Sequence, residues 1–327
     1  MKAVLCKEWG EPSTLVVEEI EAEPLSAGEV LIEVHASGMN FADTLLIAGQ
    51  YQFKPSLPFS PGFEVSGVVA EVGDGVEGLE PGDRVMAVLP YGGYAKQVVA
   101  PSTNVLRIRQ GMDFQTAAAF PLAYGTAHLA LVHRARLGAG DVLLVHGAGG
   151  NVGRAAVEVG KHLGATVIGT GSSEESLKVA SEHGADYTID YEHEDIRDRV
   201  EELTEGKGAD VILDPVGGEA FDASIRCVAW EGTILVIGFA SGHIPEAPAV
   251  QVLIRNCAVM GMDWGGYLRR EPETVREATA ETLGWYREGA LKPQPSHTFP
   301  LEQAAEALEK QSARHLTGKV VLSAGRD

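Results

Sequence analysis

The chain has 327 residues, of which 45% are hydrophobic and 22% are charged, and its formal charge is −20. At roughly 150 residues per domain this length predicts about two domains, and the composition excludes a disordered or fibrous protein. The negative charge disfavours nucleic acid and anionic membranes as partners, because both would be repelled.

The cysteines and the N-terminal residues indicate the compartment. Cys6, Cys227 and Cys257 lie far apart and form no Cys-x-x-Cys pair, so neither a disulfide framework nor a four-thiolate zinc site is expected. Residues 1–8 are interrupted by charge and are expected to form a strand, not a signal peptide. No run approaches the roughly 18 apolar residues of a membrane span. The sequence therefore predicts a soluble, cytoplasmic protein.

Two patterns of secondary structure follow each other along the chain. Short β-branched or alternating runs at 30–34, 65–70 and 84–88, separated by Pro and Gly, predict a β-rich domain. From Asp141 onward apolar strands alternate with helices, which is typical of βαβ units in a parallel, doubly wound sheet. The expected strands of this sheet are 141–146, 165–170, 186–189, 209–213, 233–237 and 257–261.

The last part of the chain lacks the βαβ pattern. After Pro272 we expect a helix to about residue 288, a strand at 296–299, a helix to Gln311 and a strand at 319–322. Because this segment has no βαβ partner, we expect it to return to the first domain. The predicted domains are 1–122, 123–264 and a returning segment, 265–327.

A glycine-rich turn follows the first strand of the parallel sheet. Its spacing, Ala148-x-Gly150-x-x-Gly153, is a variant of the dinucleotide fingerprint in which Ala replaces the first Gly. Gly150 would let the backbone approach a pyrophosphate at the helix N-terminus, and Gly153 would let the helix pack on the strand. We predict dinucleotide binding by this turn, including Asn151 and Val152. A turn that serves only helix packing is the alternative.

The second strand of the sheet ends at 171–173 in Gly-Ser-Ser, where an NAD site usually presents Asp or Glu. Small hydroxyls such as those of Ser172 and Ser173 would admit a 2′-phosphate, so this turn favours NADP(H). Ser172-x-x-Glu175 is also a capping box, so Ser172 could instead cap the next helix. Further candidate contacts are Lys178, Tyr191 and Arg314. A plain surface position is the alternative for each of the three.

Several motifs together resemble one superfamily. They lie at 40–43, 58–69, 82–85, 118–121 with 125–127, and in the glycine-rich turn. In this order they resemble the medium-chain dehydrogenase/reductases, in particular the zinc-free quinone oxidoreductase branch that includes zeta-crystallin, over essentially the whole chain. The resemblance implies an α/β fold: a Rossmann doubly wound parallel sheet inserted into a chaperonin-10-like β-rich catalytic domain, with NADPH in the cleft between them. It also implies cofactor contacts from Thr126, while Gly238 and Phe239 follow a parallel strand, where ligands bind.

The zinc-dependent members of that superfamily hold their catalytic metal with an early Cys and a Gly-His-Glu. The corresponding residues here are Asn40 and, at 62–64, Gly-Phe-Glu, so the thiolate and imidazole donors are missing. The resemblance therefore implies a metal-free reaction, with Glu64 as a structural carboxylate under the site. Without zinc to polarise an alcohol, we expect hydride transfer from NADPH to a quinone or conjugated enone.

Such a reaction needs a hydrogen-bond donor for the acceptor oxygen that becomes negative. Tyr51 and Asn40 are the candidate catalytic residues, and Tyr51 holds the place of the proton-donating Tyr of related enoyl reductases. Tyr51 could instead pack a loop, and Asn40 could only cap a helix at 41–48. His146, inside a strand, is expected to be a satisfied core histidine.

Two other functions remain open. A 2-enoyl thioester (enoyl-CoA) reductase would share the fold and Tyr51, but coenzyme A phosphates would find a basic rim only at Arg255, Arg269 and Arg270. A catalytically quiet NADPH-binding or structural protein is the third hypothesis. The expected partners are a small electrophilic acceptor and a second copy of the chain. The homodimer would form through the apolar edge strand at 256–261.

Overall fold

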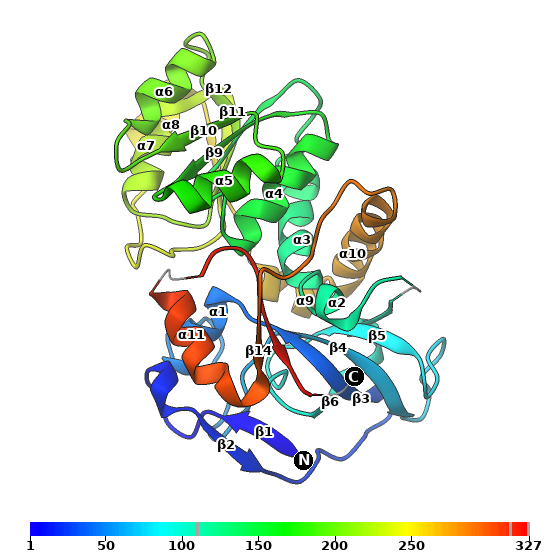
Figure 1. Ribbon diagram of the computed structural model, residues 1–327. Helices are drawn as coiled ribbons and strands as arrows, with labels where there is room; N and C mark the ends of the chain where they lie inside the picture. The colour runs from blue at the N-terminus through cyan, green and yellow to red at the C-terminus, as the bar shows by residue number, and fades with distance from the viewer. Residues whose placement is uncertain (109–110, 314–315, 326–327) are drawn as a thin grey trace. The chain divides into compact units, whose positions relative to one another are not determined.

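The computed structural model describes residues 1–108, 111–313 and 316–325 (Figure 1). Its contacts group the chain into two compact units. The β-rich unit contains Met1–Leu122, Pro272–Arg276 and Pro293–Asp327, and the parallel-sheet unit contains Ala123–Glu271 and Glu277–Lys292. Within the described residues, no helix has both the length and the apolar character needed to cross a membrane.

Among the described residues of the β-rich unit, a seven-stranded sheet has the order β14-β15-β3-β4-β5-β7, and β6 pairs with β3. Buried and half-buried residues alternate along most of β3, as a strand with one face on a core requires. Val30, Ile32 and Val34 supply that core face. The strands are β3 (Glu29–Gly38), β4 (Glu64–Val72), β5 (Arg84–Val88), β6 (Gln97–Pro101), β7 (Val105–Arg107), β14 (His297–Pro300) and β15 (Val320–Ser323), and β1 (Lys2–Leu5) pairs separately with β2 (Val16–Glu19).

Short helices complete the β-rich unit. A second apolar core contains Leu46 of α1 and Leu308 of α11, both fully buried, together with Met39 and Tyr94. This core anchors α1, which begins shortly after β3 ends. The helices are α1 (Phe41–Ile47), α2 (Phe114–Ala118) and α11 (Ala304–Ser312), with 3₁₀ turns at Pro12–Thr14, Ser102–Asn104 and Leu301–Gln303.

The parallel-sheet unit, which is described in full, contains a six-stranded sheet with the order β10-β9-β8-β11-β12-β13. The order reverses between β8 and β11, which is the topological switch point where such sheets bind ligands. The predicted fold class is therefore confirmed. The strands are β8 (Val142–Val145), β9 (Thr166–Gly171), β10 (Tyr187–Asp190), β11 (Ala209–Asp214), β12 (Val228–Val236) and β13 (Ala258–Gly261).

Helices cover both faces of this sheet. α4 and α5 contact β8, β9 and β10, whereas α7 and α8 contact β11 and β12 (Figure 1). The helices are α3 (Pro121–His128), continued by a π-helix (Leu129–Arg134), α4 (Asn151–His162), α5 (Glu174–Glu182), α6 (Ile196–Leu203), α7 (Glu219–Cys227), α8 (Ala249–Arg255), α9 (Trp264–Arg270) and α10 (Pro272–Arg287).

The returning segment differs from the expectation of a single block at 265–327. α9 and most of α10, up to Lys292, group with the parallel-sheet unit. The reason is packing: the Trp285 ring on α10 lies 4.5 Å from the His162 ring and 5.3 Å from the His128 ring, measured between centroids. From Pro293 onward the chain groups with the β-rich unit, because β15 pairs with β3 and β14 pairs with β15.

Candidate functional site

The glycine-rich turn connects β8 to α4. Gly147 has a φ of 59°, and the Gly150 N–H donates to the Gly147 carbonyl at 2.9 Å, which closes the turn. The Ala148 N–H donates to the Thr170 carbonyl of β9 at 2.9 Å. A Cβ on Gly153 would lie 2.1 Å from the Gly147 oxygen. Only glycine therefore lets the first turn of α4 pack this closely on the strand end.

The first turn of α4 fits a dinucleotide phosphate. Gly150 is the N-cap residue and supplies no side-chain acceptor for the N–H groups of this turn. Gly150 is exposed, and a Cβ there would meet only the Gly147 oxygen, at 3.2 Å. The turn is thus open where backbone N–H groups and the helix dipole favour an anion. Asn151 and Val152 open the helix at this point.

The turn after β9 carries the two predicted serines. Ser173, and not Ser172, is the N-cap of α5, because its Oγ accepts from the Ser176 N–H at 3.3 Å. The alternative that Ser172 caps this helix is therefore wrong. Tyr191 lies beside the turn, since its N–H donates to the Gly171 carbonyl at 3.2 Å.

The other predicted 2′-phosphate contacts are less direct. Lys178 is exposed on α5 and forms an ion pair with Glu182, with Nζ and Oε1 3.9 Å apart. Arg314 lies outside the described residues. Two acidic residues, Glu174 and Glu175, lie in the first turn of α5, and the sequence argument had considered Glu175 only as a capping-box partner. Their negative charge opposes phosphate binding nearby.

Buried polar residues support the carboxyl ends of the parallel strands. His146 is fully buried, its Nε2 lies 2.7 Å from Ser224 Oγ, and its Nδ1 lies 3.1 Å from Thr170 Oγ1. Burial lowers the pKa of His146, so the ring is neutral at pH 7. The expectation of a satisfied core histidine is confirmed.

The remaining predicted cofactor residues lie on two other elements of this unit. Thr126 is buried in α3, two residues after Tyr124, whose hydroxyl donates to Glu158 Oε2 at 2.7 Å. Gly238 and Phe239 follow β12, and the Phe239 carbonyl accepts from the Gly242 N–H at 2.9 Å. Their contacts with a cofactor stay predictions.

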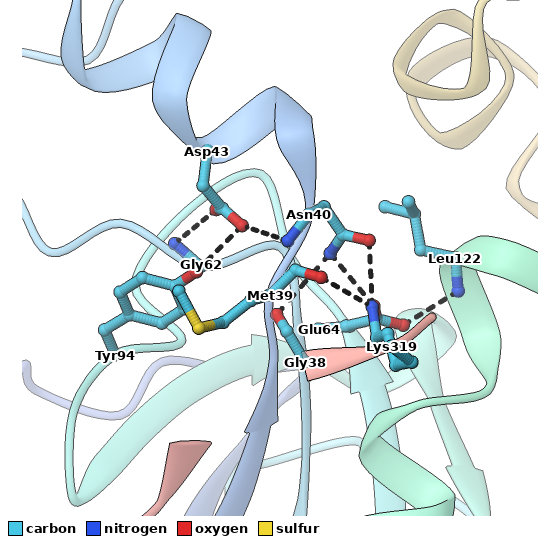
Figure 2. A network of polar contacts seen from close by, with 9 residues as sticks. All are labelled: Gly38, Met39, Asn40, Asp43, Gly62, Glu64, Tyr94, Leu122 and Lys319. Carbon is cyan, nitrogen blue, oxygen red and sulfur yellow. Dashed lines mark hydrogen bonds and ion pairs between the residues drawn. The ribbon is translucent and has the colours of Figure 1, made fainter. Parts of the chain in front are cut away.

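A buried polar network surrounds Asn40 in the β-rich unit (Figure 2). The Asn40 amide donates to Glu64 Oε1 at 2.9 Å, and its Oδ1 accepts from Lys319 Nζ at 2.9 Å. Lys319 also forms an ion pair with Glu64, and both side chains are fully buried. The Leu122 N–H donates to Glu64 Oε2 at 2.8 Å. Glu64 is therefore the structural carboxylate that the sequence argument expected.

Asp43 forms the second half of this network. Its carboxylate accepts from the Asn40 N–H at 2.8 Å, the Tyr94 hydroxyl at 2.8 Å and the Gly62 N–H at 3.1 Å. Burial raises the pKa of Asp43 to about 7, against the lowering effect of the bonds from Asn40 and Tyr94. Asn40 is the N-cap of α1 and Asp43 its N3 residue, which is the spacing of a capping box.

Tyr51 lies just beyond the end of α1. Its N–H donates to the Leu45 carbonyl at 3.1 Å, and its ring lies 5.3 Å from the Phe63 ring, measured between centroids. The side chain is half-buried against the core that holds Met39. Sequence reasoning had identified Tyr51 and Asn40 but had missed Lys319. A lysine directly before the apolar run 320–322 was the signal for the latter.

The described residues contain no group of three or more His, Cys, Asp or Glu side chains placed to hold a metal ion. Three positions, 40, 63 and 64, were compared with zinc ligands, and Glu64, the only carboxylate among them, forms an ion pair with Lys319. This arrangement gives the carboxylate a positive partner from the chain itself.

Comparisons with known proteins agree with this fold. A family model described as an alcohol dehydrogenase GroES-like domain matches residues 26–110, and one described as a zinc-binding dehydrogenase matches residues 151–282. Quinone oxidoreductase-like protein 2 homolog of Nematostella vectensis is 44% identical over 326 residues, which cover 98% of this chain and 88% of that protein.

Solved structures are similar over the whole chain. The quinone oxidoreductase of Pseudomonas syringae has a TM-score of 0.93 at 33% identity, covering 98% of this chain and 99% of its own. The Escherichia coli quinone oxidoreductase complexed with NADPH has a TM-score of 0.90 at 28% identity, covering 99% and 100%. The CurK enoyl reductase has a TM-score of 0.89 at 27% identity, covering 98% of each chain.

The two-part fold and the glycine-rich turn on α4 define a medium-chain dehydrogenase/reductase. Within that class, this chain belongs to the quinone oxidoreductase family.

Proposed function

We propose that this chain is an NADPH-dependent oxidoreductase that reduces a quinone or a conjugated enone without a metal. The observation that carries the proposal is the glycine-rich turn at 147–153. Its exposed residue Gly150 leaves the backbone N–H groups at the start of α4 accessible to a phosphate. The NADPH complex of the similar Escherichia coli enzyme supports NADP(H) as the cofactor. When bound, NADPH supplies the hydride.

The chain's own residues would hold the cofactor at three places in the parallel-sheet unit. The first turn of α4 would bind the pyrophosphate through its backbone N–H groups. Ser172 and Ser173 would bind the 2′-phosphate, with Tyr191 and Lys178 beside them. The Ser173 hydroxyl accepts one hydrogen bond as the cap and keeps its own proton to donate to a phosphate oxygen. Thr126, Gly238 and Phe239 would contact the nicotinamide half.

In the β-rich unit, Tyr51 is the favoured donor to the acceptor oxygen. A positioned phenol can stabilise negative charge on that oxygen and can pass on its proton. Asn40 is the second candidate, but its amide already donates to Glu64 Oε1 at 2.9 Å and, more weakly, to the Gly38 carbonyl at 3.4 Å. Because of these bonds, we favour Tyr51 as the residue that donates a proton to the acceptor, and we assign Asn40 a structural role beside it.

A panel of quinones, enones and enoyl thioesters, followed by the loss of NADPH absorbance, tests the proposal. We expect turnover with at least one quinone or enone. Retention of NADPH with no turnover of any acceptor would instead point to a quiet binding protein. Because the positions of the zinc donors hold Asn40 and Phe63, we also expect activity to survive exhaustive chelation. Stoichiometric zinc in the purified protein would contradict the proposal that the reaction needs no metal.

An enoyl thioester reductase is the second candidate function, supported by the similarity to an enoyl reductase and by Tyr51. Coenzyme A phosphates would need a basic rim, and two of the three arginines that could form one already have partners within the chain. Arg255 donates to the Val228 carbonyl at 3.2 Å, and Arg269 lies 3.7 Å from an Asp263 oxygen. We therefore expect weaker turnover of enoyl-CoA than of a quinone in the same panel.

We further propose a reducing compartment such as the cytoplasm, because all three cysteines are buried and free.

A further inference from the structure

Lys319 carries a charge in the interior of the β-rich unit. Its side chain is fully buried, and it lies directly before β15 (Figure 2). Its ammonium donates to the Met39 carbonyl at 2.9 Å, to Asn40 Oδ1 at 2.9 Å and to Glu64 Oε1. These three acceptors match the three protons of an ammonium group, and one acceptor is anionic. The site therefore holds the charged form of Lys319 in a defined position.

The two charged neighbours fix the orientation of the Asn40 amide. An ammonium group only donates, so it selects the Oδ1 end of the amide, and a carboxylate only accepts, so it selects the Nδ2 end. Glu64 has room for this contact because residue 38 is glycine: a Cβ there would lie 2.6 Å from Glu64 Oε1. Rotating the amide by half a turn would place two donors face to face and two acceptors face to face.

The same contacts fix the start of α1 and, through it, Tyr51. Lys319 holds the carbonyl of Met39 and the side chain of Asn40, the two residues that separate β3 from α1. On the other side, Asp43 ties the first turn of α1 to the Gly62 backbone and to Tyr94. α1 then leads directly to Tyr51, whose N–H is bonded to Leu45 within that helix.

We infer that Lys319 is a positioning residue for acceptor reduction: it orients the Asn40 amide and sets the place of α1 relative to the sheet. This inference rests on the proposed function, because it requires the acceptor to bind beside Asn40 and Tyr51. It assigns a role to a residue that lies 279 positions after Asn40 in the sequence. Lys319 itself neither donates a proton to the acceptor nor touches it.

The test compares three variants with the wild type. Lys319→Met removes the ammonium and leaves Glu64 buried without its cation, which destabilises the fold as well. Glu64→Gln removes only the negative charge and keeps Lys319 facing Oδ1. The double variant Lys319→Met with Glu64→Gln removes both charges, which restores much of the stability. In the double variant the new side-chain amide at position 64 carries both a donor and an acceptor, so it no longer selects one orientation of Asn40.

The measurements are the thermal midpoint, the NADPH Kd and kcat/KM for one quinone. We expect the thermal midpoint of the double variant to be equal to or higher than that of Glu64→Gln, because Glu64→Gln leaves the Lys319 ammonium buried without an anion. We expect the NADPH Kd values of the two variants to agree within about twofold. We expect the kcat/KM of the double variant to be about tenfold lower or worse, because small misplacements of positioning groups have effects of that size. Lys2→Met, which breaks an exposed ion pair with Glu302 in the same unit, is the control and should change none of the three.

Equal kcat/KM for the double variant and Glu64→Gln would overturn the inference, because the buried pair would then serve stability alone. A loss of NADPH affinity in step with kcat/KM would also overturn it, because the effect would not be specific to the acceptor. Failure of the proposed function is a separate result, since the wild type itself would then turn over none of the acceptors.

Discussion

At the scale of single residues, Tyr51 carries the proposed proton transfer. Tyr51→Phe keeps the half-buried ring against Phe63 and removes only the hydroxyl. We expect kcat to fall by roughly 10² with enones and by less with quinones, because a hydroquinone anion takes its proton from water. NADPH affinity should stay near that of the wild type. Unchanged kcat for every acceptor would return Tyr51 to a packing role.

Asp43 should make the free energy of unfolding depend on pH, and the direction of its pKa shift determines the sign of that dependence. Burial raises the pKa of this carboxyl from 3.8 to about 7 in the folded chain. The folded state therefore binds a proton that the unfolded state has released, and this contribution to stability is lost as the pH rises from about 4 to about 7.

The comparison that isolates Asp43 is the free energy of unfolding of the wild type minus that of Asp43→Asn, measured by denaturant titration across this range. The difference should become less favourable to the wild type as the pH rises. A difference that grows with pH would mean that the bonds from Asn40 and Tyr94 outweigh burial.

The buried network also shows which residues of the site can be read from sequence. Asn40 and Glu64 were identifiable because they occupy motif positions within short segments. Lys319 was not, because its contact with them depends on how β15 pairs with β3 in the sheet. Asp43 was likewise part of a quoted motif, but its bonds to Tyr94 and Gly62 depend on loops brought together by folding.

At the scale of elements, we predict that the turn after β9 determines the preference between NADPH and NADH. We expect NADPH to bind at least about tenfold more tightly than NADH, or about 1.4 kcal/mol, because 171–173 presents hydroxyls and no acid. The acids Glu174 and Glu175 in the first turn of α5 work against this preference.

A carboxylate placed in the turn should reduce or abolish the preference for NADPH. Ser172→Asp is expected to lower NADPH affinity tenfold or more by repelling the 2′-phosphate, with little effect on NADH. Ser181→Asp adds the same charge at an exposed position near the other end of α5 and serves as the control. Equal titrated affinities of the wild type for the two cofactors would contradict this account of the turn.

Apolar runs explain why the strands of the parallel sheet were predictable. Each expected run is found as a strand, and the largest difference is β12, which begins at Val228 and not at residue 233. The early part pairs with β11 across a register irregularity, carries Trp230 on the surface and places Glu231 at a φ of 61°. These features hide the strand pattern. The cap of α5 was missed by one residue because adjacent serines carry the same signal.

At the scale of the whole molecule, we predict a homodimer through the edge of the parallel sheet. β13 is one of the two edge strands of this sheet, and the neighbouring α8 and β12 expose large apolar side chains: Leu253 is 77% exposed and Trp230 69%. Unpaired strand edges and exposed apolar patches both favour association, and a two-fold axis would close it.

Sedimentation at micromolar protein concentrations measures the oligomeric state directly. The wild type should sediment as a dimer, and Leu253→Glu should shift it toward the monomer by placing a charge in the apolar surface. Val17→Glu changes a 40% exposed residue on β2 of the β-rich unit and should leave the dimer intact. A monomer mass for the wild type throughout would contradict the prediction.

The central claim is hydride transfer from NADPH to the acceptor, and isotope tracing tests it most directly. NADPH deuterated at one face of C4 of the nicotinamide is incubated with the enzyme and a conjugated enone, and the reduced product is examined by mass spectrometry. We predict that deuterium from one of the two faces, and not from the other, appears on the β-carbon of the product. Product without deuterium from either face, or no product while NADPH remains bound, would contradict the account.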